Sequence, residues 1–201
     1  MPGTETLKQP KQLIVEGKDD KIFFIYFLEH LRVDDIQVQV YEGKDNLGPF
    51  LKALLLTPGY DQCEVLGIVR DADDDPQAAF NSARTALQSA GLPEPPAPEM
   101  STGDSPRVSV LILPNGNTAG MLESLCYAAV ADDPVVPCVD EFLSCVQERI
   151  DGPNPLPKAQ VGAFLATRES PGLQLGHGAR KGYWPWHSPT FQHVREFLTS
   201  L

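Results

Sequence analysis

The chain has 201 residues, of which 42% are hydrophobic and 21% are charged, and its formal net charge at pH 7 is -11. These values fit a single compact domain over residues 1–201, and the lack of an 18-residue apolar run excludes a transmembrane helix. The acidic balance argues against a broad basic surface for nucleic acid, because phosphate contacts depend on clustered lysine and arginine. The stretch MPGTETLKQPKQ lacks the apolar core of a secretory signal, so we expect a cytoplasmic protein.

Strands and helices alternate over the first 130 residues. Apolar runs predict strands near residues 11–17, 36–41, 63–71 and 107–114. Helical patterns follow these runs near residues 19–31, 44–56, 75–91 and 120–131. This alternation predicts an α/β fold with a parallel sheet of about four strands, covered by helices on both faces.

The second part of the chain has a different pattern. A proline-rich stretch over 92–106 suits an exposed connection rather than a packed element. Helical patterns then dominate, near residues 139–150, 157–168 and 191–198. We therefore predict a core over about 11–131 and a C-terminal helical elaboration over about 132–201.

The cysteines are interpreted as structural. Cys63, Cys126, Cys138 and Cys145 show no zinc-ligand spacing, and a cytosolic chain of this size does not need a disulfide framework. Cys138 and Cys145 are seven residues apart, on one face of a predicted helix. We expect them to be small core residues.

Carboxylates follow the predicted strands. Glu16 ends the first strand, Asp71 and Asp73 end the third, and Glu123 begins the helix after the fourth. In a parallel α/β sheet, ligands bind beyond the carboxyl ends of the strands, so these side chains share one edge. If the extended geometry continues past Asp71, the period of two makes Asp71 and Asp73 point the same way.

Converging carboxylates repel each other unless a proton or a cation relieves them, and hard oxygen ligands suit magnesium, manganese or calcium. Acidic residues at strand ends also commonly cap the following helix or are solvated. We assign Asp19, Asp20, Asp74 and Asp75 to that class. The two stretches VEGKDD and VRDADDD together favour a divalent-metal site.

In these residues the sequence resembles the Toprim domain family. The family pattern is a glutamate at the end of the first strand, here IVEG, and a DxD at the end of the third, here VRDADDD. The likeness covers about the first 130 residues and is closest to the OLD-type nucleases and their small stand-alone members of undefined function. In that small group it also includes the later KGYWPW stretch.

The resemblance implies a Toprim-like (Rossmann-like) fold and a site that breaks or joins phosphodiester bonds. By that resemblance Asp71 and Asp73 bind Mg (or Mn), and Glu16 binds the metal or acts in acid–base catalysis. Glu123 resembles an additional acidic ligand. The chain departs from the larger family members, because it has no domain for a nucleophilic tyrosine, no zinc ribbon and no Walker A loop.

Three functions remain open. The first is a magnesium-dependent nuclease or nuclease subunit that meets DNA or RNA through the metal site, which the set of acids favours. The second is a non-catalytic metal-binding module that regulates or binds a protein partner, which the acidic surface favours. The third is hydrolysis of a small nucleotide phosphate, which the negative charge tolerates better than long DNA.

Two loops lie on the same predicted edge. Lys44 and Asn46, after the second strand, are placed either to reach a phosphate or to form a plain capped turn. The stretch LPNGNTAGMLE lacks the Rossmann spacing, and we interpret it as an ordinary turn capped by Thr118.

The stretch RKGYWPWHSP combines aromatic and basic residues. Such clusters stack bases in single-strand binders, but we favour a hydrophobic plug. Lys181 in this stretch is our candidate for a catalytic cation near the acidic edge. The histidines His177, His187 and His193 have no metal-ligand spacing.

Overall fold

The computed structural model describes residues 5–201. Four strands form one sheet: β1 (Lys11–Val15), β2 (Ile36–Val40), β3 (Val65–Asp71) and β4 (Arg107–Leu113). Their order is β2-β1-β3-β4, and every neighbouring pair is parallel. The predicted α/β fold, a four-stranded parallel sheet flanked by helices, is confirmed, and it agrees with the expected Toprim-like arrangement.

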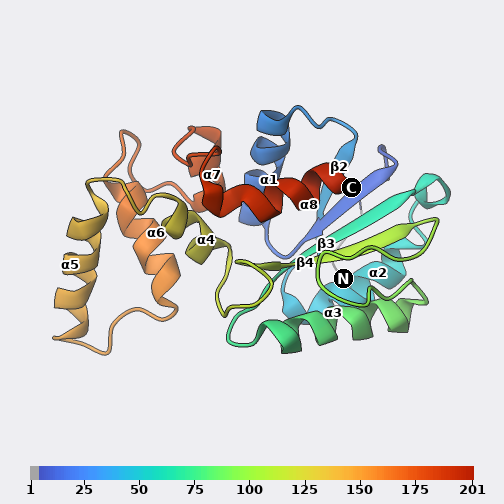
Figure 1. Ribbon diagram of the computed structural model, residues 1–201, viewed down its shortest axis with the longest axis horizontal. Helices are drawn as coiled ribbons and strands as arrows, with labels where there is room; N and C mark the ends of the chain where they lie inside the picture. The colour runs from blue at the N-terminus through green and yellow to red at the C-terminus, as the bar shows by residue number, and fades with distance from the viewer. Residues whose placement is uncertain (1–4) are drawn as a thin grey trace.

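Helices cover both faces of the sheet. They are α1 (Lys18–Leu31), α2 (Leu47–Leu54), α3 (Pro76–Ala90), α4 (Leu122–Ala129), α5 (Val136–Gln147), α6 (Leu156–Ala166), α7 (Leu175–Arg180) and α8 (Gln192–Ser200). Short 3-10 turns occur at η1 (Lys44–Asn46), η2 (Tyr60–Gln62) and η3 (Pro189–Phe191). Helices α2 and α3 cover one face, whereas α1, α7 and α8 cover the other (Figure 1). Helices α5 and α6 lie beyond one end of the sheet, at the left of Figure 1.

Alternation along the strands divides the core into two layers. Leu13 and Val15 of β1 pack on the α1 side, whereas Ile14 packs on the α2–α3 side. In β3, Val69 belongs to the α1 side and Ile68 to the α2–α3 side. Consecutive residues at the end of β3 therefore serve opposite faces of the sheet.

Helix α7 was not predicted from the sequence, because glycines at 176 and 178 are poor helix formers. The helix packs closely against the start of α1. The Gly176 N–H donates to Asp19 Oδ1 at 2.8 Å, and a Cβ on Gly176 would lie 2.4 Å from the Asp19 carbonyl oxygen. Glycine is needed here for close approach, so a poor helix former stabilises the tertiary contact.

The aromatic stretch packs into the core. Trp184 is 2% exposed, and its Nε1 donates to the Leu175 carbonyl at 3.0 Å. Its ring stacks on Phe164, and Trp186 stacks on Phe27 with ring centroids 4.8 Å apart. The hydrophobic interpretation of this stretch is therefore confirmed.

The prediction that Cys138 and Cys145 are core residues is wrong. Both are exposed, whereas Cys63 and Cys126 are buried. Helix α5 packs with a face that includes Val136, Val139 and Leu143, and the cysteines lie on its outer side. A helix at the end of the molecule buries one face only, and the spacing of seven does not say which.

In the described part of the chain, no helix is long and apolar enough to cross a membrane.

The close packing of α7 on α1 predicts opposite effects of alanine at two helical glycines. Gly176→Ala places a methyl group against backbone, and we expect it to lower the free energy of unfolding by about 1–3 kcal/mol. In contrast, a Cβ on Gly162 in α6 meets nothing within 4 Å. Gly162→Ala should raise stability by about 0.5–1 kcal/mol through helix propensity. Urea unfolding measures both, and a stable Gly176→Ala would contradict the described packing.

Candidate metal centre

Glu16 lies directly after β1, at the carboxyl edge of the sheet. Its Oε2 accepts a hydrogen bond from the Tyr41 hydroxyl at 3.3 Å. Burial raises the pKa of Glu16 and the Arg70 guanidinium lowers it, while the carboxylates of Asp20 and Asp73 raise it further. Glu16 therefore lies among both acidic and basic groups.

Asp71 is the last residue of β3, and it connects this strand to α4. Its Oδ1 accepts the Leu122 N–H at 3.0 Å. Leu122 is the first residue of α4, so this N–H has no partner within the helix. The dipole of α4 also favours a negative charge at this end. Burial nevertheless raises the pKa of Asp71 well above its usual range.

Three further carboxylates lie near enough to Asp71 to act on its pKa. Those of Asp20, Glu123 and Glu16 each add to the rise in its pKa, in this order of effect. Burial also raises the pKa of Glu123, whose Oε1 lies 3.9 Å from Lys158 Nζ. The structure thus brings the predicted residues Glu16, Asp71 and Glu123 to one place.

From the sequence, Asp20 was expected to cap the following helix or to be solvated. It does cap α1, because its Oδ2 accepts the Gly17 N–H at 2.8 Å. Asp20 also belongs to the set of carboxylates around Asp71, which we call the acidic group: Glu16, Asp20, Asp71 and Glu123. Burial raises the pKa of Asp20 as well. The spacing could have indicated this second role, since Asp20 follows Glu16 by about one helical turn at a strand-to-helix junction.

Asp73 is placed differently from Asp71. Its φ of 50° is left-handed, so the extended geometry ends and the period-two argument does not apply to it. Its backbone exchanges two hydrogen bonds with Gly120, at 2.9 and 2.7 Å. The Asp73 side chain is 50% exposed, and its Oδ2 lies 3.9 Å from Lys44 Nζ. Asp73 therefore lies at the rim of the acidic group rather than inside it.

A pocket of about 540 Å³ opens at this rim. Lys44 and Asp73 line it together with residues at the start of α4, including Met121 and Ser124. Residues 154–157, which lead into α6, complete the lining. The volume is in the range of small-molecule sites. A ligand in it would lie directly beside the acidic group.

The donor set fits a hard cation by its chemistry. All the converging groups are carboxylates, and their mutual repulsion is relieved by a cation. Among residues 5–201, however, no three or more His, Cys, Asp or Glu side chains are arranged so that they could hold a metal ion. Magnesium commonly uses one or two carboxylates and fills its other positions with water and substrate phosphate. An open set of this kind is compatible with magnesium or manganese.

The structure does not place Lys181 at the acidic edge. Lys181 is exposed at the C-terminal end of α7 and takes part in none of the ion pairs of the described residues. Its catalytic role stays a prediction. Lys158 of α6 is the lysine beside Glu123, and sequence reasoning missed it because α6 approaches α4 only in the tertiary structure.

The loop before α4 is an ordinary turn, as expected, but its acceptor differs. Asn115 Oδ1 accepts from the backbone N–H groups of Asn117 and Thr118 and from the Thr118 hydroxyl. Asn115, not Thr118, therefore holds this turn.

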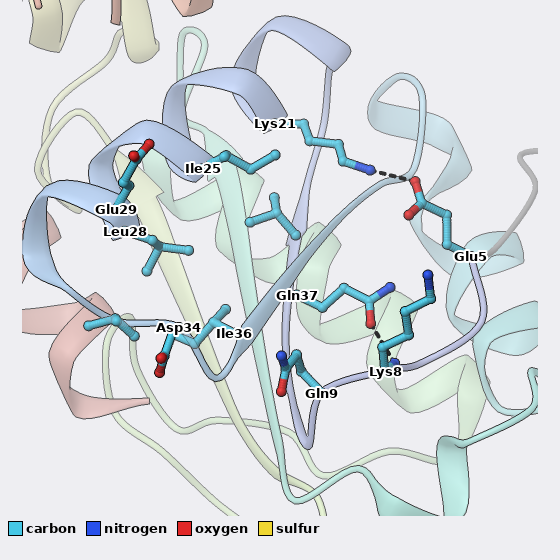
Figure 2. Close-up of a pocket in the computed structure, with 12 residues that line it drawn as sticks. Glu5, Lys8, Gln9, Lys21, Ile25, Leu28, Glu29, Asp34, Ile36 and Gln37 are labelled. Atoms are coloured by element: carbon cyan, nitrogen blue, oxygen red, sulfur yellow. Dashed lines mark hydrogen bonds and ion pairs between the residues drawn. The ribbon is translucent and has the colours of Figure 1, made fainter. Parts of the chain in front are cut away.

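A slightly larger pocket, of about 570 Å³, lies between α1 and β2 (Figure 2). Ile25, Leu28 and Ile36 contribute apolar surface, and the ion pair of Lys21 with Glu5 lies at its rim. None of the predicted site residues lines it, so this pocket is separate from the acidic edge.

Comparison with known proteins gives a family and a fold. Residues 10–201 match the family described as protein of unknown function DUF3226. No curated protein matches. A hypothetical protein of Pyrococcus horikoshii OT3 has a similar structure, with a TM-score of 0.60, 18% identity, and 94% of this chain and 92% of that chain covered. At this identity the likeness shows a shared fold.

Two further solved structures align over most of their length. The C-terminal region of the Xanthomonas campestris pv. campestris OLD protein has a TM-score of 0.47 and 18% identity, with 96% of this chain and 98% of that chain covered. The corresponding region of the Burkholderia pseudomallei OLD protein has a TM-score of 0.47 and 13% identity, with the same coverage.

The burial of Asp71 predicts a pH-dependent effect of Asp71→Asn in metal-free protein. Folded Asp71 holds its proton more tightly than the unfolded residue, whose pKa is about 3.9. Its contribution to stability is therefore full below about pH 4 and is lost as the pH rises through the raised pKa. Asparagine keeps an acceptor for the Leu122 N–H and has no charge.

We expect Asp71→Asn to be more stable than wild type at pH 8, with the difference shrinking toward pH 4. Urea unfolding in a chelator measures it, with exposed Asp74→Asn as the control. A difference that does not change with pH would contradict the buried placement of this carboxylate.

Proposed function

We propose that this chain, which belongs to the family described as protein of unknown function DUF3226, acts on phosphodiester bonds with magnesium or manganese, as a nuclease or a nuclease subunit. One observation carries the proposal: partly buried carboxylates from separate βα units lie together at the carboxyl edge of a parallel sheet. Their placement raises their pKa values, which is costly for a purely structural cluster.

Each acid has a proposed part. Glu16, Asp71 and Asp73 would hold the metal, with Glu123 as a helper and Asp20 as an addition from the structure. The bound metal would stabilise negative charge that develops on the phosphate. The Leu122 N–H holds Asp71 in place, and the 3.9 Å ion pair with Lys158 restrains Glu123.

Glu16 is also suited to proton transfer. Its pKa is raised by burial, which moves a carboxyl group toward the range where it exchanges protons near neutral pH. The Tyr41 hydroxyl donates to Oε2 and fixes the orientation of the carboxylate. Glu16 would therefore accept or donate a proton at Oε1 while Oε2 stays hydrogen-bonded.

A specific observation also favours the second candidate, a non-catalytic protein-interaction module. Phe142 of α5 is 58% exposed and Ile150 is 65% exposed, at the end of the molecule away from the sheet. A contiguous apolar patch formed by these two side chains would suit a protein partner. Such a module would still bind a metal ion at the acidic edge of the sheet but would not cleave phosphodiester bonds.

The test is cleavage of defined substrates by purified protein with Mg or Mn. Linear duplex, plasmid, single-stranded DNA, RNA and nucleoside triphosphates cover both the nuclease and the small-phosphate alternatives. We expect metal-dependent cleavage by wild type and a loss of about 100-fold or more in Asp71→Asn and Asp73→Asn, since each removes charge from the metal edge.

The matched control is Asp104→Asn, which removes the charge of an exposed aspartate that does not line the pocket at Asp73. It should cleave like wild type. Equal metal-dependent cleavage by wild type and Asp71→Asn would refute the assignment of the chemistry to the acidic edge. No cleavage of any substrate by wild type would favour the protein-interaction module.

A further inference from the structure

A second polar pocket lies on the face of the sheet that α2 and α3 cover, opposite the face that α1 covers. It has a volume of about 370 Å³ and lies between η1, α2 and α3. Arg70, the residue before Asp71, lines it and is only 8% exposed. Lys44, Ser82 and Thr85 also line it, and its one carboxylate is that of exposed Asp45.

The Arg70 guanidinium has few partners for a buried cation. Within residues 5–201 it donates one hydrogen bond, from Nη1 to the Lys44 carbonyl at 3.4 Å, and takes part in no ion pair. Arginine has five N–H donors, and among the described residues no Arg70 nitrogen is both fully buried and unpaired, so its unpaired donors reach solvent. Glu16 feels the charge of Arg70 but does not pair with it. Most of the Arg70 donors therefore remain available to a ligand.

Lys44 connects this pocket to the acidic edge. It lines both the Arg70 pocket and the pocket at Asp73. Its Nζ lies 3.9 Å from Asp73 Oδ2, and its side chain is 61% exposed. An anion at Arg70 would therefore lie next to the place where a substrate phosphate would meet the metal edge.

We propose that Arg70 and Lys44 form a phosphate-binding subsite, which takes a phosphate group of the substrate next to the one at the acidic edge. Arginine binds phosphate through paired N–H donors, and lysine adds a point charge. The Ser82 hydroxyl, which has no hydrogen bond to the described residues, supplies a further donor. The anion site stands on the pocket itself, whereas its assignment to the substrate rests on the proposed function.

The first test uses inorganic phosphate and metal-free wild-type protein, with amide chemical shifts followed by NMR. We expect saturable shifts in residues 43–48 and a dissociation constant raised at least about fivefold in Arg70→Gln and in Lys44→Gln. Lys44 is exposed, so its variant keeps the test valid if Arg70→Gln does not fold. Lys52→Gln, on the outer side of α2, and Asp71→Asn should not weaken binding.

Absent shifts, or equal affinity in Lys44→Gln and Lys52→Gln, would overturn the site. This outcome does not depend on activity, so failure of the nuclease assignment would be seen separately.

The second test separates a substrate phosphate from a free anion. A trinucleotide with a 5′-phosphate and the same trinucleotide without it are bound in chelator. We expect the phosphate to tighten binding at least about threefold in wild type and not in Lys44→Gln. Equal affinities in wild type, with inorganic phosphate still bound, would overturn the assignment to the substrate and leave a site for a small free anion.

Discussion

The partly buried carboxylate of Asp71 is the constraint on which the site depends. It ends β3, receives the first N–H of α4, and so fixes the helix that brings Glu123 to the edge of the sheet. The same placement buries negative charge among Asp20 and Glu16, which disfavours ionisation of all of them. A fold that keeps this arrangement carries an electrostatic cost that a cation would remove, and this cost is the physical basis of the proposed metal centre.

The sheet edge carries opposite charges on its two faces because side chains alternate along β3. Asp71 joins the acidic group next to α1 and α4, whereas Arg70 enters the pocket next to α2 and α3. Lys44 lies between the two, within 3.9 Å of Asp73. A phosphate chain laid across this edge would meet the proposed metal centre on one side and the cations Arg70 and Lys44 on the other. The net charge of -11 therefore does not exclude a polyanionic ligand, since the positive charge is local.

The fold and part of the site could be predicted because strand ends are readable in the sequence. Apolar runs that stop at Glu16 and Asp71 define one edge of a parallel sheet. The features that the sequence did not predict depend on local backbone geometry or on contacts between distant segments. The left-handed φ of Asp73 is not visible in a DxD pattern, and Asp20 looked like a cap because it is one. Lys158 reaches the site through the packing of α6 on α4, for which no local pattern exists.

The central claim is tested most directly by calorimetric titration of magnesium and manganese into wild type, Asp71→Asn and Asp104→Asn. If the acidic edge is a metal centre, wild type and Asp104→Asn bind the ion and Asp71→Asn does not. Adding a non-cleavable dinucleotide to each titration supplies phosphate oxygens for an ion that needs them. Equal binding by wild type and Asp71→Asn, or no binding by wild type even with the dinucleotide, would contradict the account.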